Sequence, residues 1–141
     1  MNYSAESADK TARVSEKKTL RTANDAAAFF AKYKGKEQEH FLVATFDGAR
    51  HLLKVHCVFI GTIDRCPVSP REIFRKILLD NAKSFVVAHN HPSGTTRPSD
   101  EDKHLTRQLK EASYLMGIEF LDHIIITKEN GFFSFMGNGI L

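Results

Sequence analysis

The sequence predicts a single α/β domain in which a mixed β-sheet carries helices on its faces. Apolar runs with strand character alternate with amphipathic segments that begin at capping residues, in the order α, β, β, α, β, α, β, β. The length of 141 residues suits one domain, and the 42% hydrophobic content suits a packed core. No apolar stretch approaches the ~20 residues of a membrane span. The N-terminus also lacks the apolar core of a signal peptide, so we expect a cytoplasmic location.

The first part of the chain differs in composition from the rest. Residues 1–21 are polar, with little apolar periodicity, and we expect a disordered or loosely attached arm followed by a domain over residues 22–141. The net charge is only +3. A short basic run in the arm could touch nucleic acid, although a solvated tail is the preferred interpretation. The run consists of Lys10, Arg13, Lys17, Lys18 and Arg21.

One helix and two strands are expected in the first half of the domain. Asn24 can cap a short helix. Two runs with strand character follow at residues 39–46 and about 51–60, separated by a turn at Asp47-Gly48. Cys57 lies inside the second apolar run, which predicts a buried thiol.

Two strong helix starts mark the second half. Ser69-Pro70-Arg71-Glu72 combines a serine cap, a proline at the first helical position and the glutamate of a capping box. Ser99-Asp100-Glu101-Asp102 is a second cap pattern, and its helix should end near Gly117. Asn130-Gly131 is the strongest hairpin signal of the chain. The strands expected in this half cover residues 84–88, 118–127 and 132–135.

Two histidines and an aspartate follow the buried strand at residues 84–88. In extended backbone, residues two positions apart point the same way, so His89 and His91 can face one ion. With Asp102 they make three ligands, which leave one zinc position open, as in catalytic zinc sites. Ser99 and Asp102 also have a simpler interpretation as a helix cap. Capping and catalysis are not exclusive here.

These residues carry a resemblance to a known family. The pattern His-x-His-Pro, six residues, Ser-x-x-Asp, from His89 to Asp102, resembles the JAMM metalloprotease motif of MPN domains. The variant His-Asn-His-Pro-Ser-Gly, preceded by Pro-Arg-Glu-Ile-Phe and followed by Leu-Asp-His, is similar to the bacterial RadC branch. The resemblance covers about residues 24 to 141. It implies a cytidine-deaminase-like (JAB/MPN) fold with one zinc ion per chain, bound by His89, His91 and Asp102.

The resemblance also implies a general base on the first strand. By position this is Glu39, and Glu37 is the rival on the same face. We prefer Glu39, since it adjoins the apolar run and the rigid sheet; either carboxylate could instead be a solvated strand end. The Ser99 hydroxyl would donate to the oxyanion. His123 could be a second-shell partner of the metal or a packed strand histidine.

The expected function is a zinc-dependent metallohydrolase of the JAMM type, acting on a peptide or isopeptide bond of a protein or peptide substrate. Two alternatives stay open: a DNA-associated, repair-related factor and a non-catalytic MPN binding module. Full-length RadC proteins carry an N-terminal helix-hairpin-helix module, whereas we expect only a short polar arm ahead of the domain in this sequence. We therefore expect DNA binding that is at most weak and non-specific. A zinc deaminase is disfavoured, because its Pro-Cys-x-x-Cys signature is absent.

Overall fold

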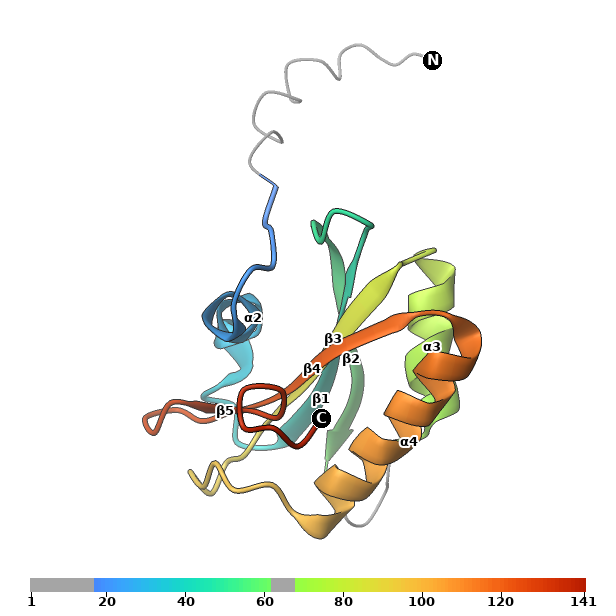
Figure 1. Ribbon diagram of the computed structural model, residues 1–141. Helices are drawn as coiled ribbons and strands as arrows, with labels where there is room; N and C mark the ends of the chain where they lie inside the picture. Colours follow the sequence, from blue (N-terminus) through green and yellow to red (C-terminus); the bar gives the residue numbers. More distant parts are fainter. Residues whose placement is uncertain (1–16, 62–67) are drawn as a thin grey trace.

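The protein is described by a computed structural model that covers residues 17–61 and 68–141. Within these ranges, five strands form one sheet, with helices on both of its sides (Figure 1). Among the described residues, no helix has the length and apolar composition that crossing a membrane requires. In chain order the elements are α2 Ala23–Phe29, η1 Ala31–Tyr33, β1 Glu39–Phe46, β2 Leu52–Gly61, α3 Pro70–Leu79, β3 Ser84–Asn90, α4 Asp100–Met116, β4 Glu119–Ile126 and β5 Phe132–Ser134.

The sheet is mixed, as the sequence predicts, and its strands lie in the order β2-β1-β3-β4-β5. β1 pairs antiparallel with β2 and with β3, and β4 pairs antiparallel with β5. β3 and β4 are parallel, joined by a crossover through α4. All residues of β3 are buried, which agrees with its central place in the sheet. The α/β architecture is therefore confirmed.

Two apolar cores lie on opposite faces of the sheet. Alternate residues of β1 and β3 face opposite sides, as strand geometry requires. Phe41 and Val87 pack with Leu109 in the core under α3 and α4, whereas Leu42 and Val86 pack in the core under α2. Figure 1 shows α2 on one side of the sheet and the α3/α4 pair on the other. Residues that continue the parity of Phe41 and Val87 therefore face α4.

The cap of α2 and the hydrogen bonding at the start of α3 differ from the predictions. Thr22, not Asn24, caps α2: its hydroxyl accepts from Asp25 N, and the Asp25 carboxylate accepts from Thr22 N. At α3, Ser69 is the cap, with Pro70 at the first position, but its hydroxyl accepts from Arg71 N. The expected capping box at that helix is thus wrong, because the serine bonds to the second helical amide instead of the third.

The end of the expected N-terminal arm is attached to the domain. Residues 1–16 of the arm lie outside the described residues. Leu20 is buried in the core under α2, its N–H donates to Arg50 O (2.9 Å), and Leu52 N donates to Lys18 O (2.8 Å). Thr19 forms a bridge with His51. The expected boundary at residue 22 therefore excludes residues that the fold uses, because Leu20 is apolar and finds a place in the core.

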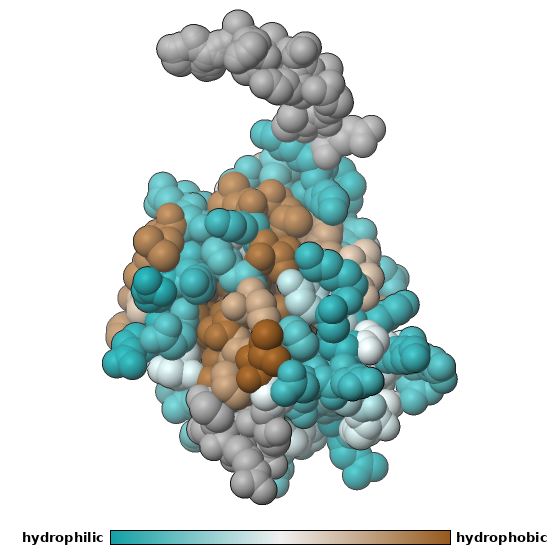
Figure 2. Space-filling model, turned by 180° about the vertical axis from the view of Figure 1, so that it is seen from behind, coloured by the Kyte–Doolittle hydropathy of each residue, from teal (hydrophilic) through white to brown (hydrophobic). Residues whose placement is uncertain are grey.

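β2 is an edge strand, which explains a second difference. Cys57 is exposed, not buried, because no strand of the described part of the chain pairs with the outer side of β2 and its faces are only partly covered. Leu53 and Ile60 of the same strand are also exposed. The side of the molecule turned away in Figure 1 carries hydrophobic surface broken up by hydrophilic side chains (Figure 2).

Candidate metal centre

The two histidines and the aspartate of the motif meet at the end of β3. His89 is in β3 and His91 follows it, so both rings face α4. Asp102 lies in the first turn of α4, and all three residues are buried. His89 Nε2 lies 2.9 Å from His91 Nε2. The Asp102 carboxylate oxygens lie 3.2 Å from His89 Nε2 and 3.4 Å from His91 Nε2.

This donor set fits a single metal ion. His89, His91 and Asp102 each offer one ligand atom, and these atoms all lie within 4.8 Å of one another. Zinc bonds of ~2.0–2.1 Å in a tetrahedron place ligand atoms about 3.3 Å apart, close to the distances between these atoms. Neutral imidazoles and a carboxylate are ordinary ligands of divalent metals. The group could therefore hold a metal ion.

The surroundings of the group favour the ligand form of Asp102, and at His91 a metal ion would compete with a proton. Burial alone would raise the pKa of Asp102, but hydrogen bonds from His89 and His91 lower it far below its usual range. Asp102 is thus a carboxylate. Burial likewise opposes protonation of His91, yet hydrogen bonds to Asp102 and the Thr95 carbonyl raise the pKa of this ring. A cation bound beside the ring would compete with that proton.

Each histidine bonds to a partner through its other ring nitrogen. His91 Nδ1 lies 2.8 Å from the Thr95 carbonyl oxygen, which can only accept, so Nδ1 carries a proton and Nε2 is the nitrogen that binds an ion in the neutral ring. His89 Nδ1 lies 3.0 Å from Nε2 of the fully buried His123, whose pKa burial and the neighbouring His89 hold well below its usual range. His123 is thus a neighbour of the group.

Asp102 and Ser99 serve the helix and the group together. Ser99 Oγ accepts from Asp102 N at 3.0 Å, and the Asp102 carboxylate accepts from Ser99 N at 2.9 Å. This is the expected capping box. The carboxylate also faces His89 and His91. Because Ser99 Oγ accepts in this bond, its own hydrogen is left to donate elsewhere, and Ser99 is exposed to solvent.

A polar pocket of about 460 Å³ joins the group to the expected catalytic residues. Glu37, Glu39, His91, Arg97 and Ser99 are among the residues that line it. Glu39 is half-buried at the start of β1 and its charge helps to raise the pKa of His91. Glu37 is exposed and precedes the strand. The structure thus brings Glu39 and Ser99 to the same pocket as His91.

Two residues of the site region were not predicted as contributors. Asn90 lies between the histidines and faces the α2 side, where its side chain bonds to the backbone at the start of β1 and just ahead of it. Thr106 lies one turn after Asp102 and bonds to His123. The sequence offers one signal for Asn90: it is a polar residue in a strand that is buried on both faces, and such a side chain needs hydrogen-bond partners. Thr106 carries no comparable signal in the sequence.

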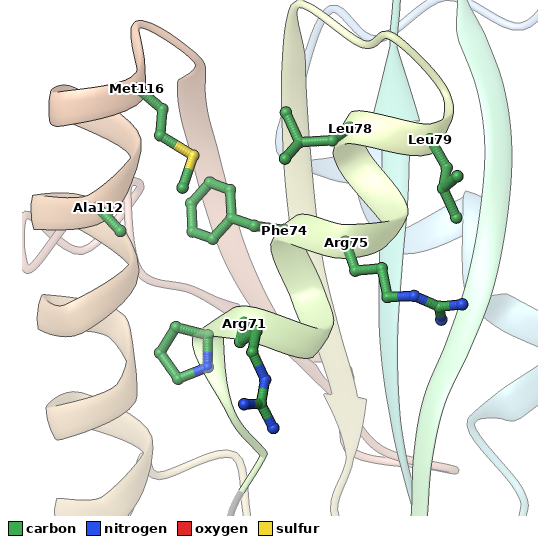
Figure 3. Close-up of a pocket in the computed structure, with 8 residues that line it drawn as sticks. Arg71, Phe74, Arg75, Leu78, Leu79, Ala112 and Met116 are labelled. Atoms are coloured by element: carbon green, nitrogen blue, oxygen red, sulfur yellow. The ribbon is translucent and has the colours of Figure 1, made fainter.

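A larger cavity lies elsewhere and has a different character. It lies between α3 and α4, measures about 650 Å³ and is apolar. Figure 3 shows the Phe74 ring directed from α3 toward Ala112 and Met116 of α4, with Arg71 and Arg75 along the same helix. None of the described residues that line it is a histidine or a carboxylate, so the chemistry of the site belongs to the smaller polar pocket.

Comparison with known proteins places this site in a family context. The RadC-like JAB domain family matches residues 20–140. A UPF0758 protein of Methanospirillum hungatei is 46% identical over 94 residues, which cover 67% of this chain and 42% of the relative. A UPF0758 protein of Actinobacillus pleuropneumoniae serotype 5b is 44% identical over 107 residues, 76% of this chain and 48% of the relative. One of Shouchella clausii is 37% identical over 123 residues, covering 82% and 54%.

These relatives show which part of the chain is shared, but their names do not show what reaction it performs. Their shared name, UPF0758 protein, states no activity. The chain spans about half the length of the curated relatives it matches. The match to residues 20–140 begins at Leu20, the residue whose side chain enters the core ahead of α2.

Proposed function

Because the chain belongs to the RadC-like JAB domain family, we propose that it is a zinc-dependent metallohydrolase of the JAMM type that cleaves a peptide or isopeptide bond. One observation carries the proposal. His91 belongs both to the buried group that could hold a metal and to the lining of the pocket with Glu39 and Ser99. A potential Lewis-acid site, a carboxylate and a hydroxyl thus border one space. Two imidazoles and one carboxylate, with a position left open, are typical of catalytic zinc.

Each residue has a defined task in this proposal. His89, His91 and Asp102 would hold a zinc ion, which when bound would supply a Lewis acid for the substrate carbonyl and lower the pKa of water to about 7. Glu39 accepts the proton of the attacking water and passes it to the leaving amine, a role worth about 10²–10⁴-fold in rate. The Ser99 hydroxyl donates to the oxyanion, where the loss of one donor costs about 10²–10³-fold.

Glu39 is tested against its rival by a pair of matched substitutions. Glu39→Gln should retain bound zinc and a normal melting temperature but lose hydrolysis, because an amide cannot accept the proton of water. Glu37→Gln should keep most of its activity, since Glu37 is exposed and precedes β1. Both are measured in a screen of peptide and isopeptide substrates, with and without a chelator. An active Glu39→Gln together with an inactive Glu37→Gln would show that the general base is Glu37 and not Glu39.

The same screen distinguishes a hydrolase from a non-catalytic binding module. A hydrolase loses its activity when the chelator removes zinc and regains it when zinc is returned. A wild-type protein that binds zinc but cleaves none of the peptide or isopeptide substrates would contradict the proposed reaction while leaving the metal site in place.

A further inference from the structure

A chain of hydrogen bonds runs from His89 to the backbone of Asp102 through two residues that are not in the metal-binding group. His89 Nδ1 lies 3.0 Å from His123 Nε2, and His123 Nδ1 lies 2.6 Å from Thr106 Oγ1. Thr106 Oγ1 donates to the Asp102 carbonyl oxygen at 2.8 Å. The chain thus starts at a histidine of the group, passes through β4 and α4, and ends on the backbone of the aspartate.

The chemistry of the groups fixes the direction of every bond in this chain. The Asp102 carbonyl can only accept, so Thr106 donates its single hydroxyl hydrogen to this oxygen. Thr106 Oγ1 must then accept from His123, which places the proton of His123 on Nδ1. A neutral imidazole with its proton on Nδ1 offers a lone pair at Nε2. His89 therefore donates from its Nδ1, so in the neutral ring the lone pair is on Nε2, the atom that faces His91 and Asp102.

We infer that His123 and Thr106 are positioning residues of the metal centre, which hold His89 in the tautomer whose Nε2 can bind the ion. The inference rests on the proposed metal site and deepens it. His91 does not depend on this chain, because the Thr95 carbonyl fixes its tautomer separately. The two histidines of the motif are thus prepared by different means, one by a loop carbonyl and the other by a buried side-chain relay.

The packing around His123 keeps the relay rigid. Its ring stacks on Phe135 at 4.3 Å between centroids and meets the edge of Phe41 at 6.0 Å. Phe41 also stacks on the His89 ring at 5.8 Å. Phe41 and Phe135 therefore pack against the rings of His89 and His123. Removal of a hydrogen-bonding partner that orients a metal ligand typically changes metal affinity by about 10–100-fold.

Two pairs of variants test the relay by zinc affinity, measured in competition with a chromophoric chelator. Thr106→Val keeps the shape of the side chain but removes the hydroxyl, whereas Thr106→Ser keeps the hydroxyl. His123→Phe keeps an aromatic ring between Phe41 and Phe135, whereas His123→Gln restores an acceptor for His89. We expect Thr106→Val and His123→Phe to weaken zinc binding by about 10–100-fold. Thr106→Ser and His123→Gln should lose clearly less than their partners.

The ring protons of His89 give a readout that a purely structural role would not change. Long-range ¹H–¹⁵N spectra of the metal-free protein should show the Nδ1–H tautomer of His89 in the wild type and in Thr106→Ser, and a tautomer mixture in Thr106→Val. Equal zinc affinity within both pairs, or an unchanged tautomer in Thr106→Val, would overturn the inference. If the wild type binds no zinc, the proposed function fails, and the metal-free spectra still decide on the relay.

Discussion

Asn90 lies between the two histidines of the motif but faces the opposite side of the sheet. Its amide oxygen accepts from His40 N at 2.7 Å, and its nitrogen donates to the carbonyls of Lys36 at 3.2 Å and Gln38 at 3.0 Å. The side chain is fully buried. Asn90 therefore ties the strand that carries His89 to the segment that carries Glu39.

Asn90→Asp should reduce hydrolysis without reducing metal binding. The carboxylate can still accept from His40 N but cannot donate to the two carbonyls, so the segment before β1 should loosen. We expect unchanged zinc content, faster hydrogen exchange at the His40 amide and a loss of hydrolysis on the order of 10²-fold, as small misplacements cause. Zinc content that falls along with activity would instead place Asn90 in the support of the metal ligands.

Asp122 is a buried carboxylate next to His123 that organises the C-terminal turn. It accepts from His123 N at 2.7 Å and Met136 N at 2.9 Å, and Ser134 Oγ donates to its other oxygen. Burial raises the pKa of Asp122 above its ordinary value, although these hydrogen bonds oppose the shift. Ionisation of this residue thus costs free energy in the folded state.

Asp122→Asn should therefore gain stability relative to the wild type as the pH rises. Below the unfolded-state pKa of about 3.9 the carboxyl is neutral in both states. Above it the unfolded state loses its proton first, because the folded pKa is raised, and the wild type loses stability until the folded group has also ionised. Urea unfolding of both proteins from pH 3.5 to 7 measures the difference. A loss of stability of Asp122→Asn relative to the wild type as the pH rises would contradict the raised pKa.

The ligand residues could be predicted from sequence because their signals are local. His89 and His91 are two positions apart in a strand, and Ser99 and Asp102 are three apart at a helix start, so local geometry brings each pair together. The relay could not be predicted in this way. His123 meets His89 across 34 positions, a contact that exists only because β4 pairs with β3.

At the scale of elements, the segment before α2 is part of the folded domain. Leu20 is only 9% exposed, packs in the core under α2 and donates its N–H to Arg50 O. The backbone of Lys18 accepts from Leu52 N at the start of β2. The polar composition of residues 1–21 hid this contact, because one leucine among charged neighbours produces no periodicity.

Leu20→Ala should therefore destabilise the protein. Removal of a buried leucine side chain typically lowers the free energy of unfolding by about 2–5 kcal/mol. The control is Arg21→Ala, which alters an exposed neighbour and keeps the backbone bond from Arg21 N to Asp25, and should stay within about 0.5 kcal/mol of the wild type. Chemical denaturation measures both. Equal stability of Leu20→Ala and the wild type would show that the segment is dispensable for folding.

At the scale of the whole molecule, the two faces of the sheet have different roles. Each face has an apolar core, but the face under α4 also carries His89 and His123, whereas the face under α2 carries the Asn90 bonds. The α/β class and the order of elements were predictable from periodicity and caps. The strand order was not, since it depends on pairings between distant segments, and the edge position of β2 left Cys57 exposed against expectation.

The zinc content of the purified protein tests the central claim most directly. We predict one zinc ion per chain in the wild type, bound by His89, His91 and Asp102. His91→Ala should lose most of it, because two ligands hold zinc far more weakly than three. His104→Ala, which removes an exposed histidine of α4, should keep the wild-type content. Equal zinc in wild type and His91→Ala, or none in the wild type, would contradict the account.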